Sequence, residues 1–420
     1  MKLLYYILFF VIFSSIYYFV ICQNVPSSRR EQTSILVGTK LYFFGGDTSI
    51  GESNEVWYLD LSSSFNVSTP PWHSDVAMPA GYNLGTSCLS PIDNSTVFLV
   101  GGRTWIANTA DYSYTSLVYK FNSKTSQWTL PNINNFNSSF TTRNEIQAVI
   151  DNNGKIFIFG GRDYNNSTKL FYNDMNILDI TTMSWSTLIQ SQSLLTHTLY
   201  TATLLPNGLI VYIGGESGSS LNISLTDMAQ SASGSIIASR AAHSAVLTQD
   251  GNIIIYGGSA LDSSGNYVKI FFDIAVLNTN SWVWFVPIVS GTSAPPLSDH
   301  SAALYNNYMI LAFGATSTSN FYTNNIYILD IQNYTWVTKT NSVKQTQSNG
   351  NSSTDQANNN YSYLYIGIGI GAGVVILTVV SFIIGYFIYK NRHKEEFIAT
   401  PGTSKNDHIR ETHMPTVYTP

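Results

Sequence analysis

The stretch KIFIFGG, Lys155 to Gly161, decides the fold because close copies of it recur along most of the chain. In each copy several apolar residues run into a glycine pair, which the last copy reduces to Gly-Ala. The other copies are KLYFFGG (Lys40–Gly46), TVFLVGG (Thr96–Gly102), LIVYIGG (Leu209–Gly215), NIIIYGG (Asn252–Gly258) and MILAFGA (Met309–Ala315). Their last residues are separated by 56, 59, 54, 43 and 57 positions. A phrase repeated about every 50 residues indicates a propeller or a solenoid.

Each repeat predicts four antiparallel strands, the number in one propeller blade. A first strand such as HSAVL (His243–Leu247) leads through the turn pair Asp250-Gly251 into the apolar run. The run, rich in Ile, Val, Phe and Tyr, is typical of a strand that is buried on both faces. The glycine pair ends this strand, where the backbone must turn or approach a neighbour without a Cβ.

The third predicted strand ends in Asp or Asn, both of which form turns, and a tryptophan on the fourth strand follows. Third strands are predicted at VWYLD (Val56–Asp60), VYKFN (Val118–Asn122), MNILD (Met175–Asp179), AVLN (Ala275–Asn278) and IYILD (Ile326–Asp330). The corresponding tryptophans are Trp72, Trp128, Trp185, Trp282 and Trp336. No tryptophan lies between Glu216 and Ala238, so we expect the fourth blade to be short or irregular.

This order of features resembles the kelch repeat. The best single match is Arg240-Ala-Ala-His243-Ser, followed by IIIYGG and Trp282. The resemblance covers roughly residues 32 to 337 and implies an all-β, six-bladed kelch-type β-propeller. It says little about function, because one fold serves many unrelated tasks. The sequence leaves open whether the ring closes and whether the polar lead at residues 23–31 adds a strand to the last blade.

The two ends of the chain predict a membrane protein. Residues 1–22, one lysine followed by an apolar run, are typical of a secretory signal peptide, with an uncleaved signal anchor as the alternative. We expect the propeller ectodomain at residues 23–340, a disordered polar stalk at 341–363 and a transmembrane helix at 364–389. The last range contains no charged residue.

Lys390, Arg392 and Lys394 follow the predicted span, which indicates that the tail at residues 390–420 is cytoplasmic. The prediction is therefore a single-pass type I membrane protein whose propeller is extracellular or lumenal. Small residues at Gly367 and Gly371, four positions apart, could let two spans pack as a homodimer. The tail could have a small signalling or sorting role through Thr400-Pro401 or Tyr418.

N-glycosylation sequons support this orientation, because every one precedes the predicted span. They begin at Asn66, Asn94, Asn137, Asn165, Asn166, Asn222, Asn333, Asn351 and Asn360. The 11% of charged residues and the net charge of −5 make nucleic acid an unexpected partner. Removal of the signal would leave Cys88 as the single cysteine, so no intrachain disulfide is expected.

Candidate chemistry is sparse. His243 and His300 each stand fourteen residues before a repeat glycine, Gly257 and Gly314, so we interpret them as structural, with metal ligation as the alternative. The kelch-type propeller is also the central domain of galactose oxidase and related copper radical oxidases, which bind copper through two Tyr and two His. In that family one Tyr is crosslinked to a Cys, a part open here to Cys88 alone, which we otherwise interpret as a small buried hydrophobe.

No such copper set maps onto the sequence, so we assign no catalytic, cofactor-binding or metal-ligating residue. We expect a non-catalytic binding protein that recognises an extracellular or lumenal protein or glycan. A membrane-tethered copper oxidase is the alternative. The loops between second and third strands collect on one propeller face and are the expected binding surface. Their aromatic residues, which could contact a ligand or merely cap blade junctions, are Trp105, Tyr112, Tyr114, Tyr164, Tyr267 and Phe321.

Overall fold

A computed structural model of the chain describes residues 25–113, 118–136, 140, 143–165, 168–188, 196–218, 232–262 and 266–340, without the side chains of residues 164, 165, 168 and 169. The predicted signal segment (1–22), stalk (341–363), membrane span (364–389) and tail (390–420) lie outside the described residues. Within the described ranges there is no helix whose length and apolar character would let it cross a bilayer.

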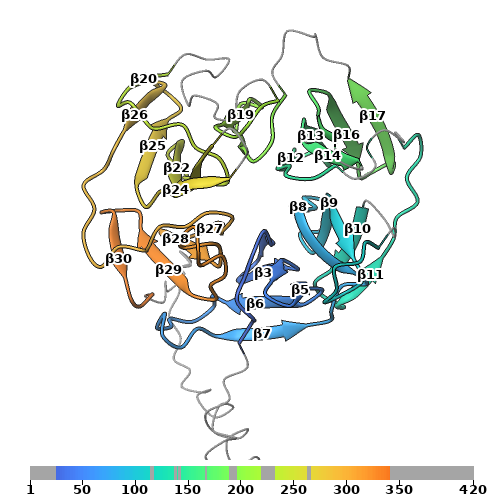
Figure 1. Cartoon of the computed structure of the whole chain (residues 1–420), viewed down its shortest axis with the longest axis horizontal. Coiled ribbons are helices and arrows are strands. Elements are labelled where there is room, and N and C mark those ends of the chain that lie inside the picture. The colour runs from blue at the N-terminus through green and yellow to red at the C-terminus, as the bar shows by residue number, and fades with distance from the viewer. Residues whose placement is uncertain are drawn as a thin grey trace, which may run out of the picture. The chain divides into compact units, whose positions relative to one another are not determined.

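Six antiparallel blade sheets follow one another along the described chain and stand around a central axis (Figure 1). Blade 1 contains β2 (Thr33–Val37), β3 (Lys40–Phe44), β6 (Val56–Asp60) and β7 (Trp72–Asp75). Blade 2 contains β8 (Gly81–Leu89), β9 (Thr96–Trp105), β10 (Val118–Asn122) and β11 (Gln127–Thr129). Blade 3 contains β12 (Ala148–Ile150), β13 (Lys155–Phe159), β16 (Met175–Asp179) and β17 (Ser184–Leu188).

The second half of the ring is less regular. Blade 4 has two strands among the described residues, β18 (Thr201–Leu204) and β19 (Ile210–Ile213). Blade 5 contains β21 (Ser244–Leu247), β22 (Asn252–Tyr256), β25 (Ile274–Asn278) and β26 (Val283–Phe285). Blade 6 contains β27 (Ser301–Tyr305), β28 (Tyr308–Ala312), β29 (Ile326–Asp330) and β30 (Thr335–Val337).

Blade 4 departs from the repeat, as its sequence predicts. After Gly218 the described chain resumes at residue 232, and β20 (Ser233–Gly234) pairs in parallel with β26 on the outer edge of blade 5. The chain between blades 4 and 5 therefore contributes a strand to the next blade.

Short additional strands lie in the connections between second and third strands, and one more precedes the first strand of blade 1. The first small sheet consists of β1 (Arg29–Arg30), β4 (Asp47–Thr48) and β5 (Gly51–Glu52). Two hairpins follow in blades 3 and 5, made of β14 (Arg162–Asn165) with β15 (Thr168–Phe171) and β23 (Ser259–Leu261) with β24 (Tyr267–Ile270). The sequence pattern did not predict these strands.

The third-strand predictions are confirmed at β6, β10, β16 and β29. The third strand of blade 5, β25, begins one residue earlier than predicted, at Ile274. The tryptophan prediction is wrong in blade 5. Trp284, not Trp282, pairs with the penultimate residue of its third strand, Leu277, as Trp185 pairs with Leu178. Trp284 is 1% exposed, and Trp282 occupies the turn with φ +55°.

The turn explains the error. Ser126, Met183 and Tyr334 have the same left-handed backbone two residues before their blade's tryptophan. A tryptophan at this turn position therefore stands two residues out of phase with the repeat. In blade 5 the side chain that is buried against the neighbouring strand is that of Trp284, two residues later.

Aromatic and aliphatic side chains fill the wedges between blades, as expected for a ring of sheets. At the junction of blades 1 and 6, Phe43 and Trp72 pack against Phe313 with ring centroids 5.1 and 5.6 Å apart. At the junction of blades 2 and 3, Trp185 belongs to one buried cluster with Phe98. The prediction that phased tryptophans are packing residues is confirmed at these junctions.

The ring closes, and a circle of backbone hydrogen bonds joins each blade to the one before it. Each blade has one residue with a left-handed backbone near the start of its first strand, within β8 in blade 2 and just before the strand elsewhere. The amide of this residue donates to the carbonyl of its equivalent in the preceding blade. The six N···O distances lie between 2.8 and 3.0 Å. The residues, in order around the axis, are Glu31, Leu84, Glu145, Leu199, Ala242 and Asp299. We call them the inner ring.

A second circle explains the glycine pairs. The amide of each second glycine donates to a carbonyl of the next blade, as Gly46 does to Tyr82 at 2.7 Å. The first glycine faces that same carbonyl, and a Cβ on Gly45 would lie 2.0 Å from the Tyr82 oxygen. In the last repeat Phe313 takes the first position with φ +65°, so Gly314 matches the second glycine rather than the first.

The polar lead does not add a strand to blade 6. Among the described residues of the lead, strand β1 pairs with β4, and one β-bridge to blade 6 joins Arg29 and Thr323. At the other end of the chain, Thr340 donates its amide to Phe65 at 3.0 Å and accepts the Phe65 amide on Oγ1 at 3.0 Å. Blade 6 is therefore built from consecutive strands, and both ends of the ring fasten to blade 1.

Candidate functional site

Antiparallel order places the connections on two opposite faces. Turns from first to second and from third to fourth strands form what we call the hairpin face. Connections from second to third strands, such as 45–55, 160–174 and 257–273, form the loop face together with the segments that enter each blade. The glycine pairs and the inner ring lie at the loop-face end of the strands.

A cavity of about 430 Å³ opens at the axis on the loop face, above the inner ring. We call it the axial funnel. Its charged lining residues are Arg30, Glu31, Glu145, Arg162, Glu216 and Asp299. Tyr267 and Phe321, two of the predicted loop aromatics, also line it. The funnel has the size of a ligand pocket.

The inner ring explains why carboxylates gather here. Its left-handed backbone directs each residue's side chain to the axis, and three of its six positions are Glu31, Glu145 and Asp299. The connection after each glycine pair supplies the opposing groups, including Arg162 in β14 and Glu216. Equivalent positions of different blades therefore meet at one point of the molecule.

Arg162 bridges two of these carboxylates. One guanidinium nitrogen donates to Glu145, and the other donates to Glu216 at 3.3 Å. All three side chains are at most 10% exposed. Glu145 also accepts the Thr198 hydroxyl at 2.8 Å.

Arg30 occupies the opposite side of the funnel. Its Nε lies 3.0 Å from Asp47 and 3.5 Å from Glu31. The guanidinium carbon lies 5.2 Å from the ring centre of Phe321 and 5.7 Å from that of Tyr322. A cation held between carboxylates and aromatic faces is firmly positioned.

The funnel disfavours ionised carboxylates. Burial raises the pKa of Glu31, and Arg30 only partly opposes it, because Asp299, Asp47 and Glu145 act in the same direction as burial. Burial likewise raises the pKa of Asp299, against Arg30 and the Tyr267 hydroxyl that donates to it. Both carboxyls therefore hold their protons to a higher pH than exposed acids.

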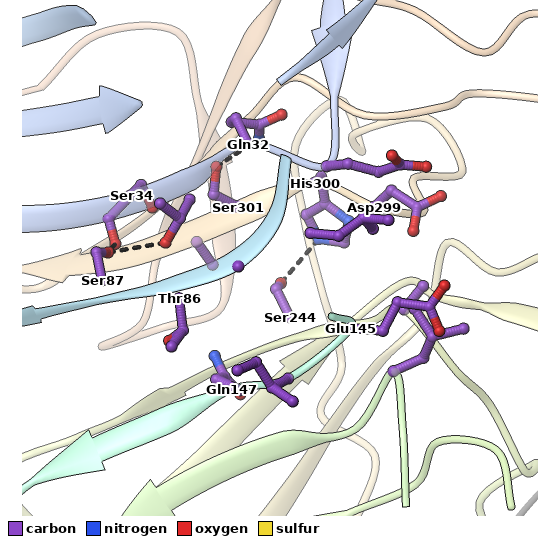
Figure 2. A pocket seen from close by; sticks show the side chains of 18 of the residues that line it. Gln32, Ser34, Thr86, Ser87, Glu145, Gln147, Ser244, Asp299, His300 and Ser301 are labelled. Carbon is purple, nitrogen blue, oxygen red and sulfur yellow. Dashed lines mark hydrogen bonds between the residues drawn. The ribbon is translucent and has the colours of Figure 1, made fainter. Parts of the chain in front are cut away.

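A narrower cavity of about 330 Å³ continues along the axis beneath the inner ring (Figure 2). Polar residues of the first strands line it and tie each blade to the one before. Gln32 Nε2 donates to Ser301 Oγ at 2.6 Å, and His300 Nε2 lies 2.7 Å from Ser244 Oγ. His243 Nε2 lies 3.0 Å from Thr201 Oγ1 in the same way.

These contacts favour the structural interpretation of the two histidines. Burial lowers the pKa of His300 to about 3 and that of His243 well below its usual value, so both are neutral. Each ring contributes Nε2 to a bond between blades. Within the described ranges, no group of three or more His, Cys, Asp or Glu residues is arranged to hold a metal ion.

Cys88, the one cysteine open to a crosslinked role in a galactose oxidase-like copper site, packs in the core. Cys88 is 3% exposed in β8 and packs in the cluster of Phe98 and Val100. Burial raises the pKa of its thiol to about 12. It is a core residue, as its alternative interpretation expects.

The predicted loop aromatics separate into groups. Tyr267 and Phe321 line the funnel. Trp105 is buried and stacks on the half-exposed Tyr112 at 4.1 Å, with its Nε1 donating to Asn83. Tyr114 and the side chain of Tyr164 lie outside the described residues. The funnel's charged residues were not predicted, although the fixed place of Glu31 and Glu145 two residues after Arg29 and Arg143 was a usable signal.

Exposed apolar side chains also lie on the loop-face connections, and one of them, Phe321, lines the funnel. Every described connection of the loop face from blades 1, 2, 3, 5 and 6 presents at least one. Those in the connections from second to third strands are Ile50, Ile106, Tyr112, Leu170, Val268, Phe272 and Phe321. We call these residues the rim. The segments that enter the blades expose others, among them Ile236 and Ile288. On the hairpin face the described turns expose Ile92 and Leu209.

Three sequon asparagines, Asn66, Asn94 and Asn333, are exposed, and each lies in a connection of the hairpin face. Asn165 lies at the end of β14, on the loop face, and its side chain is not described. Asn137, Asn166, Asn222, Asn351 and Asn360 lie outside the described residues.

Comparison with known proteins agrees with the fold. The signature described as the Attractin/LZTR1 beta-propeller matches residues 14–231, and that of the KLHDC2/KLHL20/DRC7 Kelch-repeats domain matches residues 224–382. The solved structure of YjhT superposes with a TM-score of 0.53 at 16% identity, over 74% of this chain and 97% of that one.

A curated relative extends the comparison. Acyl-CoA-binding domain-containing protein 4 of Arabidopsis thaliana is 24% identical over an alignment of 264 positions that covers 58% of this chain. The match spans 37% of that protein's length. It therefore concerns a part of the relative.

Proposed function

The chain belongs to the Attractin/LZTR1 β-propeller family of kelch-repeat propellers, and on this premise we propose that it binds a partner protein through its loop face. Kelch propellers generally serve protein interaction, which is the coarse function that the family supports. The partner is an extracellular or lumenal protein.

The distribution of exposed apolar side chains carries the proposal. Val268 and Phe272 are 58% and 61% exposed, and they lie within β24 and two residues after it. Tyr267 of the same strand lines the axial funnel together with Phe321. Exposed apolar side chains gathered around polar groups are typical of interaction sites. An apolar rim favours a protein over a glycan.

We further propose that the protein is a single-pass type I membrane glycoprotein with its propeller extracellular or lumenal. The apolar ends of the sequence, the cations after residue 389 and the sequons support this topology. The exposure of Asn66, Asn94 and Asn333 makes these residues accessible to glycan transfer. Deglycosylation of the full chain from cells should increase its mobility on gels, and an unchanged mobility would contradict the topology.

The binding proposal is tested by photo-crosslinking on cells that express the full chain. A photoreactive residue at Phe272 should capture a partner protein that mass spectrometry can identify. The same residue at Ile92, which is 62% exposed on the hairpin face, is the matched control. Val268→Asp should abolish the crosslink from position 272. Equal capture from both faces, or none, would overturn the proposal.

A further inference from the structure

The funnel carries more negative than positive groups. Four carboxyls line it, those of Glu31, Glu145, Glu216 and Asp299, and a fifth, that of Asp47, contacts Arg30 from outside the lining. Two guanidinium groups, those of Arg30 and Arg162, stand with them. When all are ionised the excess is three negative charges. The two arginines are already engaged, Arg162 between two carboxylates and Arg30 between two carboxylates and two aromatic rings.

One observation independent of this count indicates an unfilled place for a donor. Gln32 Oε1, on a side chain 7% exposed, has no hydrogen-bond partner among the described residues, while its Nε2 is fixed to Ser301. Gln32 follows Glu31 in the chain and lines the channel beneath the funnel (Figure 2). A buried acceptor of this kind normally has a donor.

The raised pKa values of Glu31 and Asp299 also indicate that the funnel would accept a positive group. Both carboxyls sit in a field that opposes their ionisation although Arg30 is close. An additional cation would stabilise their charged forms. The funnel is thus complementary to a positive group.

We propose that the axial funnel receives an arginine or lysine side chain of the partner protein, between the carboxylates of Glu31, Asp299, Glu145 and Glu216. Apolar residues on either side of that cation rest on the rim at Val268, Phe272 and Phe321. The inference rests on the proposed function and names the chemistry of the partner. An arginine suits the site best, because its five N–H groups can meet several acceptors at once.

The test compares two peptides of nearly equal shape, in one of which a neutral ureido group replaces the guanidinium group. Acetyl-Leu-Arg-Leu-amide and its citrulline analogue are titrated into the purified full chain at pH 7.5, with affinity measured by calorimetry. We expect the arginine peptide to bind at least tenfold more tightly. Equal affinities, or no binding of either peptide, would overturn the inference without any variant that could fail to fold.

Variants locate the site. The double substitution Glu31→Gln and Asp299→Asn should lower the affinity for the arginine peptide at least tenfold and leave that for the citrulline peptide unchanged. Asp111→Asn is the matched control, since Asp111 is an exposed acid of the loop face that does not line the funnel. An equal loss in both variants would place the cation elsewhere.

The two proposals can fail separately. Crosslinking of a partner at Phe272, together with equal binding of the two peptides, would retain the binding face and reject the axial cation. Selective binding of the arginine peptide without any crosslinked partner would reject the proposed protein-binding function. Selective binding together with a crosslinked partner supports both.

Discussion

On the hairpin face, the turns after the third strands share one hydrogen-bond pattern, whereas the connections of the loop face differ from blade to blade. After the third strand, an Asp or Asn side chain accepts a backbone amide two residues later in every blade with a described third strand, as Asp60 does from Ser62 and Asp330 from Gln332. On the loop face the inner ring and the amides of the second glycines recur in all six blades, and an arginine that donates to the carbonyl of the first glycine recurs in three. Beyond them one blade has a hairpin and another has an irregular loop.

The difference follows from what ring closure requires. Closure fixes the ends of the innermost strands and the close approach of neighbouring blades, and the hairpins need only tight turns. The outer parts of the loop-face connections are under neither constraint. They are where the sequence can vary to suit a partner. The predictions below test whether the two faces divide their tasks in this way.

The largest effect is expected at a tryptophan of the hairpin end. Trp284→Ala removes a side chain that is 1% exposed and should lower the free energy of unfolding by about 3–5 kcal/mol. Trp282→Asn should change it by less than about 1 kcal/mol, since asparagine tolerates the left-handed turn. Denaturant unfolding of the full chain measures both. Similar losses would restore Trp282 as the repeat residue.

The next effect concerns the shared part of the loop face. Gly45→Ala places a Cβ 2.0 Å from the Tyr82 carbonyl and breaks the approach of blades 1 and 2, so we expect a loss of about 3 kcal/mol or more. Gly38→Ala is the matched control, because Gly38 has a similar φ of +60° with no atom within 4 Å of a Cβ. It should lose about 1–2 kcal/mol. Equal losses would mean that backbone conformation alone requires the glycine.

A smaller effect tests the variable part of the same face. Below the unfolded-state pKa of about 4.3, Glu31 is protonated in both states and contributes nothing. Above it the unfolded chain ionises first, because the folded pKa is raised, so stability falls as pH rises towards the folded pKa. Glu31→Gln should therefore stabilise the protein at pH 7.5, on the order of 1 kcal/mol, and not at pH 4.

Glu55→Gln is the opposite control for this experiment. Although burial would raise the pKa of Glu55, its contacts with Arg29 lower it. Its stabilisation is present above the unfolded pKa and is lost as pH falls, so the substitution should destabilise at pH 7.5. Thermal melts at both pH values give the signs. The same sign for both variants would contradict the negative field of the funnel.

The smallest effect is expected at a single hairpin turn. Asn278 accepts the amides of Asn280 and Ser281, both at 3.0 Å. Asn278→Ala should cost about 1 kcal/mol, and Asn278→Asp should cost less, because a carboxylate accepts the same bonds. Urea unfolding measures the free energy of unfolding of both variants, and equal losses would show that the hydrogen bonds of this turn are not what Asn278 contributes. Binding of the arginine peptide should not change in either, since this turn lies on the face opposite the funnel.

The sequence predicted the parts that closure imposes. Third strands, glycine pairs and the irregular fourth blade were recognisable, because the same geometry recurs and leaves the same residues in place. Trp282 misled because a turn residue can mimic a strand residue at a distance of two positions. The funnel was not predicted, since Glu31 and Asp299 are 268 positions apart and meet only when the ring closes.

The fastening of the chain's last described residues decides how the propeller would bear tension. Lys339 bridges Asn66, and Thr340 is bonded twice to Phe65, so the end of blade 6 is tied to blade 1. A force applied to the chain beyond Thr340 would reach this seam before any strand of blade 6. We therefore expect the contacts between the first and last blades to break first when the chain is pulled.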